Sequence, residues 1–292
     1  MIDLRNVFIL KNIRASNVNL IMNDYAAGLP SPLSFLGLAD LIARNLKLVP
    51  WSARVIPVLH RVTVSEGRTK PEMEWKIIKE TKLDVFSPVE TMEDLKGSVE
   101  VSLLIHLPGC DSESLVREQI VGRRIAGGLI QNDQVEVSAA VADGSVFRDF
   151  RRGYAMIRPD QSERCFTTSG DLYDDQHGLA RIAELLFPIE RPPGFGWIVP
   201  SAVGYRLLED PATAPQRTRT RNKEVPHVYA EPVVGIAELV SVRNSKMTAL
   251  SMSGLHDLFW SWDSRGDLIL GHTNYHTHFI PTDSFEEILT ND

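Results

Sequence analysis

Cysteine and long apolar runs are both scarce in this chain. It has only two cysteines, Cys110 and Cys165, in 292 residues. These are too few for a disulfide scaffold or a zinc ribbon, and they fit a reducing cytosol. No apolar run approaches the roughly 18 residues of a membrane span, and residues 1–5 lack the basic start and apolar block of a signal peptide. We therefore expect a globular protein of the cytoplasm with a full hydrophobic core.

The motifs of several enzyme classes are missing as well. The chain has no G-x-S-x-G nucleophile elbow, no G-x-x-x-x-G-K-S/T phosphate loop and no G-x-G-x-x-G dinucleotide fingerprint. His272, His276 and His278 follow a spacing that matches no zinc motif. The Lys/Arg-Gly-aromatic-Gly-aromatic pattern of a typical RRM is also absent. We therefore expect no metal and no cofactor, and no RRM-type reading of RNA.

The net charge is −7, whereas most free-standing nucleic-acid binders are basic. The charges are unevenly distributed, however. Residues 54–82 carry seven Lys and Arg against four Asp and Glu, and residues 217–223 are strongly basic. Residues 243–292 carry three basic and seven acidic side chains. Such a chain can present a basic face to RNA and an acidic end to a basic partner. The alternative is an acidic enzyme with ordinary charge patches.

The first half of the chain alternates between strand and helix patterns. Residues 4–13 and 54–64 read as strands, and residues 31–46 read as a helix that Ser31 caps and Pro32 begins. Alternating apolar residues predict further strands at 99–107 and 135–141, with a helix at 114–123 between them. The order β-α-β-β-α-β is that of a ferredoxin-like (RRM-like) fold, so the class is α+β. The long excursion at 65–96 is unusual for a plain member of that fold and suggests a functional segment.

The second half is less regular. We expect a short helix at 179–186, a turn at 192–196, a strand at 197–205 and a loop at 210–226. Leu255, Leu258, Phe259 and Trp262 are spaced as one face of a helix. The seam between the halves is expected within 144–160. This divides the chain into residues 1–145, with the excursion, and a mixed α/β part at 146–292.

Several short stretches, in this order, resemble one protein family. They are GLPSPLSFLG at 28–37, GSVEVSLL at 97–104, RRIAGGLI at 123–130, GWIVP at 196–200, GY at 204–205 and LFW at 258–260. Together they are similar to the RAMP proteins of CRISPR surveillance complexes, and most of all to the Cas-five-type subunit of the type I-F (Csy) complex. The resemblance spans about nine tenths of the chain.

The resemblance implies a non-catalytic RNA-binding subunit that caps the five-prime handle of the guide RNA (crRNA) and helps present the complex to target DNA. It implies three partners besides the crRNA: a backbone-forming Cas-seven-type RAMP subunit, a large subunit where the complex has one, and target double-stranded DNA. The excursion at 65–96 would be a hairpin thumb. Because the chain is shorter than typical members between residues 149 and 196, it fits a minimal variant that also recognises the DNA flanking motif.

Basic side chains, glycines and one aromatic residue form the candidate RNA site, since arginines grip phosphate and bases stack on rings. The candidates are Arg61, Arg68, Lys70, Trp75, Lys76, Arg123, Arg124, Gly127, Gly128, Arg148, Arg151 and Arg152. One arginine of the 123–124 pair is expected to end a helix and the other to reach RNA. A helix would place Arg148, Arg151 and Arg152 side by side. Contacts with DNA or a neighbouring subunit are expected at Arg217, Arg219, Arg221 and Lys223.

A metal-independent endoribonuclease that cuts CRISPR repeat RNA is the alternative function. Such cleavage needs a base for the 2′-hydroxyl and an acid for the leaving oxygen, and His60, His106 and Tyr25 are the candidates. Because a separate subunit processes the RNA in type I-F systems, the resemblance favours no catalysis. An unrelated ferredoxin-like enzyme with an acidic pocket is a third possibility.

Overall fold

The computed structural model describes residues 6–23, 26–65, 70–78, 83–92, 95–140, 146–159, 183, 185–189, 195–217, 227–250 and 252–272. Within these ranges no helix is both long and apolar enough to cross a membrane. Several predictions lie outside the described residues. They are those for Tyr25, Arg68, Cys165, Arg219, Arg221, Lys223, His276 and His278, and most of the helix expected at 179–186.

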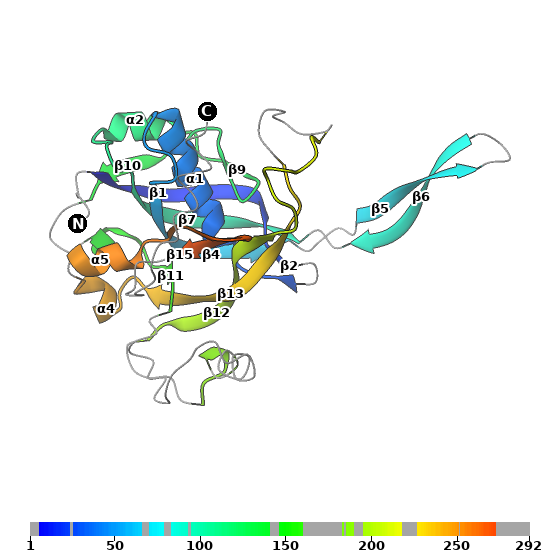
Figure 1. The fold of residues 1–292 in the computed structure, drawn as a ribbon. Coiled ribbons are helices and arrows are strands. Elements are labelled where there is room, and N and C mark those ends of the chain that lie inside the picture. The colour runs from blue at the N-terminus through cyan, green and yellow to red at the C-terminus, as the bar shows by residue number, and fades with distance from the viewer. Residues whose placement is uncertain are drawn as a thin grey trace.

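Eleven strands of the described part form one sheet, in the order β14-β15-β12-β13-β11-β4-β7-β1-β9-β8, with β10 also paired to β1. All of these pairings are antiparallel. The strands are β1 (Val7–Asn19), β4 (Arg54–Val64), β7 (Lys96–His106), β8 (Arg124–Ile125), β9 (Gly128–Ile130), β10 (Glu136–Ala139), β11 (Tyr154–Ile157), β12 (Trp197–Leu207), β13 (Ala230–Ser241), β14 (Ser261–Arg265) and β15 (Leu268–His272). The protein is therefore a mixed α+β structure dominated by an antiparallel sheet, as the sequence indicates (Figure 1).

Two helices connect the strands of the first half. Helix α1 (Pro32–Asn45) lies between β1 and β4, and α2 (Glu113–Glu118) lies between β7 and β10. The Ser31 side chain accepts a hydrogen bond from the Leu33 N–H and Pro32 begins α1, as predicted. Helix α2 is shorter than the predicted 114–123, because the chain turns after Gln119 and reaches a left-handed conformation at Gly122, with φ of 73°.

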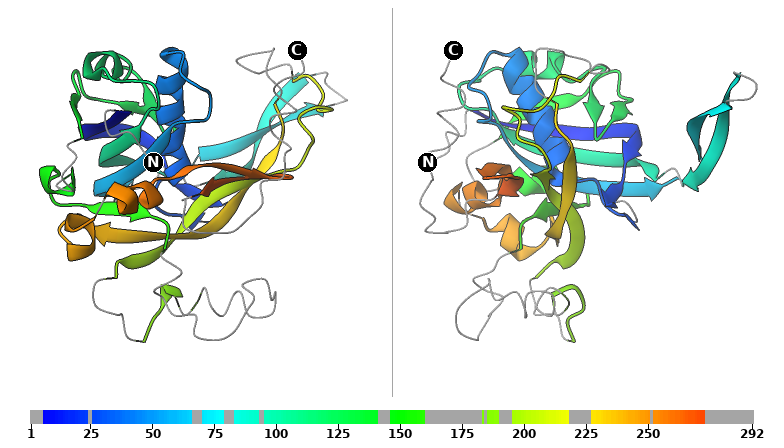
Figure 2. Two further views of the ribbon diagram at one scale, coloured as in Figure 1. Left: turned by 60° about the vertical axis from the view of Figure 1, so that its left-hand side comes forward. Right: turned by 45° about the vertical axis from the view of Figure 1, so that its right-hand side comes forward.

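The excursion at 65–96 contains the predicted hairpin. Strand β5 (Lys70–Ile78) pairs with β6 (Leu83–Met92), and the hairpin projects away from the rest of the structure in Figure 1 and in the right-hand view of Figure 2. The Ser65 N–H donates to the Lys96 carbonyl over 2.8 Å, so the hairpin leaves from the paired ends of β4 and β7. A smaller pair, β2 (Ile21–Asn23) and β3 (Ala26–Ala27), follows β1.

The two faces of the sheet are covered to different extents. On one face, α1 and α2 enclose a core that includes Phe8, Leu10, Phe35, Leu103 and Val116. On the other face a second core covers only the beginning of β1 and its neighbours, and it is built from the 3-10 helix η2 (Val146–Asp149), α4 (Ser245–Thr248) and α5 (Met252–Leu258). No described helix covers the remainder of the second face, which includes the half of β1, β4 and β7 next to the hairpin.

Of the helical face expected near the end of the chain, Leu255 and Leu258 do lie in α5, but its continuation to Trp262 is wrong, and so is a helix that carries Arg148, Arg151 and Arg152. Helix α5 ends at Leu258, and Trp262 lies in β14 opposite Gly271, because the backbone after α5 bonds to strands: the Trp260 N–H donates to the Val55 carbonyl over 2.8 Å. No helix carries Arg148, Arg151 and Arg152 together. The Arg148 and Phe150 carbonyls instead accept hydrogen bonds from Arg243, and only Arg148 lies in η2.

The sheet continues across the proposed seam. Strand β11 lies between β4 and β13, and Met156, Ala237 and Trp260 belong to the same core as the first-half strands. The division at residue 145 therefore separates two parts that share one sheet and one core, and it stays a prediction as a division into domains.

Candidate nucleic-acid interface

Two rows of polar side chains run across the uncovered part of the sheet, and we call them the open sheet face. The first row joins Thr63, Ser98, Ser16, Leu129 and Arg124, each the cross-strand partner of the next, and Leu129 is its one apolar member. In the second row, Glu100 pairs with Arg61 on one side and with Arg14 on the other, and the Gln131 N–H donates to the Arg14 carbonyl over 2.8 Å. Because cross-strand partners share a face, the arginines gather on one surface.

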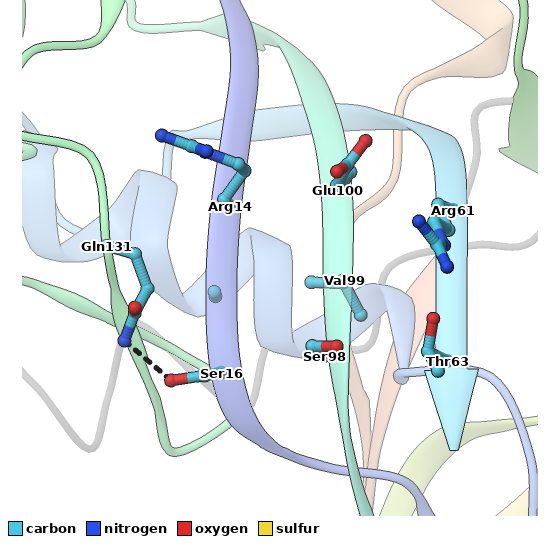
Figure 3. Close-up of a pocket in the computed structure, with 9 residues that line it drawn as sticks. Arg14, Ser16, Arg61, Thr63, Ser98, Val99, Glu100 and Gln131 are labelled. Carbon is cyan, nitrogen blue, oxygen red and sulfur yellow. Dashed lines mark hydrogen bonds between the residues drawn. The ribbon is translucent and has the colours of Figure 1, made fainter. Parts of the chain in front are cut away.

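The open sheet face is hollowed. The hollow encloses about 420 Å³ and is lined by Arg14, Ala15, Ser16, Arg61, Thr63, Ser98, Val99, Glu100 and Gln131 (Figure 3). Gln131 donates to the Ser16 hydroxyl over 2.6 Å. None of these lining residues is aromatic, so a molecule held here is bound through charge and hydrogen bonds rather than by stacking on a ring.

Bulges in two strands turn these side chains to the open face. In β1, Phe8 and Leu10 point into the helix-covered core, and after a register shift Ile13 and Ala15 do so instead. The extra residue, Asn12, has φ of 53°, which asparagine tolerates better than most residues. A second shift occurs at Asn17, with φ of 56°. Each bulge reverses the alternation, and the one at Asn12 places Arg14 and Ser16 on the open side.

A bulge of the same kind occurs in β4, where the register shifts between Leu59 and Arg61. Val55 and Leu59 belong to the helix-covered core, so unbroken alternation would bury Arg61 and Thr63 against it. The extra residue is His60, and the bulge turns Arg61 and Thr63 outward. The candidate Arg61 therefore reaches the open sheet face only because of an irregularity in its strand.

Glu100 stands at the centre of several positive charges. An Arg151 Nη2 donates to its Oε2. The pKa of Glu100 is held below its usual value, first by this hydrogen bond and further by the charges of Arg151, Arg61 and Arg14. Glu100 is therefore ionised at neutral pH. Within the part of the chain that the structure describes, the guanidinium groups of Arg14 and Arg61 have no hydrogen-bond acceptor.

The neighbouring arginines Arg123 and Arg124 have different partners, as the sequence suggests. The Arg123 Nε donates to the Gln119 carbonyl at the end of α2 over 3.1 Å, where a cation favours the helix dipole. Arg124 is exposed at the end of the first polar row, and its Nη1 donates to the Gly127 carbonyl over 2.7 Å. Only Arg124 of the pair adds its charge to the open sheet face.

Gly127 lies in the turn of a tight hairpin between β8 and β9, and Gly128 is the first residue of β9. Ala126 and Gly127 both have positive φ, 46° and 78°, as a two-residue type I′ turn requires. Gly128 is buried, and a Cβ there would lie 2.5 Å from the Ser16 carbonyl oxygen and 2.8 Å from the Val18 nitrogen. The close backbone approach expected at Gly128 is thus an approach to β1, and an RNA contact at Gly127 stays a prediction.

We expect Gly128→Ala to lower the free energy of unfolding by about 1–3 kcal/mol, because the methyl group overpacks the contact with β1. Gly37→Ala is the matched control: a Cβ there meets nothing within 4 Å, and alanine in a helix is favoured over glycine by about 1 kcal/mol. Urea unfolding followed by circular dichroism measures both. A Gly128→Ala protein as stable as the wild type would contradict the packing role.

The other candidates are less concentrated. Arg148 and Arg152 are exposed outside the hollow, and Arg217 forms two hydrogen bonds with Glu209, of 2.5 and 2.6 Å, beneath the Tyr229 ring. The backbones of Lys70, Trp75 and Lys76 lie in β5, and predictions about their side chains lie outside the described part.

Sequence reasoning missed Arg14, Ser16, Glu100 and Gln131, although the asparagines where the alternation in β1 reverses could have signalled the bulges.

Of the candidate ribonuclease residues, His60 and His106 do not converge, and Tyr25 lies outside the described residues. His60 Nδ1 donates to the Arg152 carbonyl over 2.9 Å, so its Nε2 accepts the Ser102 hydroxyl proton over 2.7 Å, and the Asn12 N–H donates to Ser102. Burial lowers the pKa of His60. His106 is buried beside Phe259, and it lies four residues beyond Ser102 on β7, about 13 Å away.

One family model matches the chain. Residues 182–269 match the model described as CRISPR-associated protein (Cas_Csy2), while no curated protein matches the chain. The matched segment includes β12, β13, α5 and β14, and with them the stretches GWIVP, GY and LFW. It does not include the open sheet face, which the first half of the chain supplies. The match shows that this segment, less than a third of the chain, is similar to a CRISPR-associated protein of the Csy family.

Proposed function

We propose that this chain is a non-catalytic subunit of a type I-F surveillance complex and binds the five-prime handle of the guide RNA on the open sheet face. The observation that carries the proposal is the position of Arg14 and Arg61. They flank the hollow and their guanidinium groups have no acceptor among the described residues. Guanidinium groups match phosphate in geometry and charge, so two adjacent phosphates of a single strand are suitable partners.

The charge of this surface supports the proposal despite the net charge of −7. Arg14, Arg61 and Arg151 surround the carboxylate of Glu100, and Arg124 adds a further positive charge at the end of the first row. The hydroxyl-bearing residues Ser16, Thr63 and Ser98 line the same hollow, and such groups can bond to a ribose 2′-hydroxyl. A positive, hydroxyl-rich groove without aromatic rings favours polar contacts with an RNA backbone.

The hairpin and the strand order support a RAMP-type arrangement. Strands β10, β1, β7 and β4 are adjacent in that order, with α1 and α2 as the crossovers, as a ferredoxin-like unit requires. The β5–β6 hairpin leaves the sheet where β4 ends and β7 begins, next to Thr63 and Ser98. RNA on the open sheet face would therefore meet the base of the hairpin, which we propose acts as the thumb. A Cas-seven-type subunit, a large subunit and target DNA remain the proposed partners, and the cytoplasm the proposed location.

The pairing of His60 favours the non-catalytic function over the ribonuclease. Its ring is held between Ser102 and the Arg152 carbonyl, and the lowered pKa keeps it neutral. Both ring nitrogens are occupied, so neither is available to a 2′-hydroxyl without breaking the network. A specific cut in repeat RNA that is lost on His60→Ala would overturn the non-catalytic proposal.

The test is neutralisation of Arg14 and Arg61, the two arginines whose guanidinium groups have no acceptor among the described residues. We expect Arg14→Gln with Arg61→Gln to weaken binding of a single-stranded RNA carrying the host repeat's five-prime handle at least about 100-fold, since each charged hydrogen bond contributes roughly 1.5–3 kcal/mol. The slope of log K against log salt should fall in magnitude by about 1.4, from about 0.7 per phosphate contact on a single strand. Fluorescence anisotropy across a salt series measures both quantities.

Arg206→Gln with Arg265→Gln is the matched control. It makes the same charge change on β12 and β14, where the arginines pair with Asp267 and Asp263. We expect RNA affinity and salt slope close to the wild type. Equal losses in both double variants would show a general charge effect and would remove the open sheet face as the RNA site.

A further inference from the structure

Glu100 is out of place on a surface that binds only phosphates. Among the described residues it is the one carboxylate that lines the hollow, and it lies between Arg61 and Arg14 in the second polar row. A carboxylate repels phosphate, so a site selected for backbone charge alone would replace it with a neutral residue. Its side chain is 32% exposed, so it is accessible from the hollow.

The hydrogen-bonding capacity of Glu100 is only partly used. Its Oε2 accepts from Arg151, and among the described residues its Oε1 accepts no hydrogen bond. The low pKa keeps both oxygens as acceptors with no proton to donate. The second row thus presents an acceptor flanked by donors: Arg61, Glu100, Arg14.

We propose that Glu100 recognises a guanine of the bound RNA through the Watson–Crick edge of the base. The inference rests on the proposed RNA function of the open sheet face. Guanine carries two adjacent donors, N1–H and N2–H₂, which match the two carboxylate oxygens. Its O6 acceptor lies beside N1–H and meets the guanidinium of a flanking arginine. The order donor, donor, acceptor on the base complements the order acceptor, acceptor, donor on the protein.

The other bases fit this row less well. Adenine places the N1 acceptor beside its N6–H₂ donor, and cytosine places N3 beside its N4–H₂. Uracil has a single N3–H donor between two carbonyl acceptors. In each case a lone pair faces an ionised carboxylate, which costs free energy. Because no described lining residue of the hollow is aromatic, the base edge supplies the selectivity here.

The experiment compares base analogues at one position of the handle RNA with the wild-type full-length protein. Selection from a handle RNA randomised one position at a time should first identify one position enriched for guanine. Replacing that guanine by inosine, which lacks the 2-amino group, or by 1-methylguanine should weaken binding about 10- to 100-fold, the usual range for a bidentate base contact. 7-Deazaguanine keeps the Watson–Crick edge and should bind like guanine.

Glu100→Gln tests the residue, with Asp267→Asn as the matched control, since Asp267 also pairs with an arginine, over 2.8 Å. We expect Glu100→Gln to remove the guanine preference and Asp267→Asn to retain it. RNA binding that depends on Arg14 and Arg61 but lacks a guanine preference, or keeps it in Glu100→Gln, would overturn this inference alone. RNA affinity that is unchanged when Arg14 and Arg61 are both replaced would overturn the proposed function and this inference together. The analogue series needs no variant, so a poorly folded Glu100→Gln protein leaves the proposal testable.

Discussion

Trp260→Ala is expected to lower the free energy of unfolding by about 3–5 kcal/mol, the usual cost of truncating a buried aromatic residue. Trp260 is 1% exposed, and its Nε1 donates to the Met156 carbonyl over 2.9 Å. Its backbone exchanges two hydrogen bonds with Val55, of 3.0 and 2.8 Å. The residue therefore joins β4 to β11 and to the strands that follow α5. Denaturation by urea with far-ultraviolet circular dichroism measures the loss.

Two further tryptophan variants separate the causes of this loss. Trp260→Phe keeps most of the ring but leaves the Met156 carbonyl without its donor, which should cost about 1–3 kcal/mol. Trp51→Ala removes a side chain that is 51% exposed and contacts the Trp262 ring edge-on at 5.9 Å, so it should cost no more than about 1.5 kcal/mol. A Trp260→Ala protein as stable as Trp51→Ala would contradict the account of one core shared by both halves.

Asp40→Asn is expected to change how stability depends on pH. Asp40 is 2% exposed on α1 and accepts a hydrogen bond from the Trp262 indole. Burial raises its pKa from the ordinary 3.8 to about 6, although the Trp262 hydrogen bond and the Arg44 charge oppose the shift. The ionised carboxylate is therefore disfavoured in the folded protein.

The sign of the effect follows from proton binding. Between pH 3.8 and about 6, the folded state holds a proton on Asp40 that the unfolded state has lost, so stability falls as pH rises through this window. The total loss is about 3 kcal/mol, from roughly 1.4 kcal/mol per pKa unit. Asparagine has no such titration. The stability of Asp40→Asn relative to wild type should thus rise between pH 4 and about 6 and stay level above about 7.

Thermal or urea unfolding at closely spaced pH values checks this result, and the change with pH is the readout rather than any constant offset. Asp111→Asn, an exposed position, is the control and should follow the wild-type curve. A difference between Asp40→Asn and wild type that does not vary from pH 4 to pH 7 would contradict the burial of a charge at Asp40.

Local sequence signals determined much of the framework. Ser31 and Pro32 mark the start of α1, because a side-chain cap and a fixed proline φ act within one turn of helix. The strand predicted at 54–64 coincides with β4, and the long excursion proved to contain a hairpin. The α+β class followed from these elements, since alternation and helical spacing are short-range properties.

The open sheet face was decided by tertiary structure. Arg14, Arg61 and Glu100 come from three strands, and Arg151 comes from the segment after η2. Their meeting depends on bulges at Asn12 and His60, which exist only as extra residues relative to a paired strand. A strand read alone shows its alternation but not its register with neighbours that are distant in sequence. The sequence by itself therefore determined the elements and the arginine-rich composition of the candidate site, whereas strand pairing determined which arginines share a surface and placed Glu100 among them.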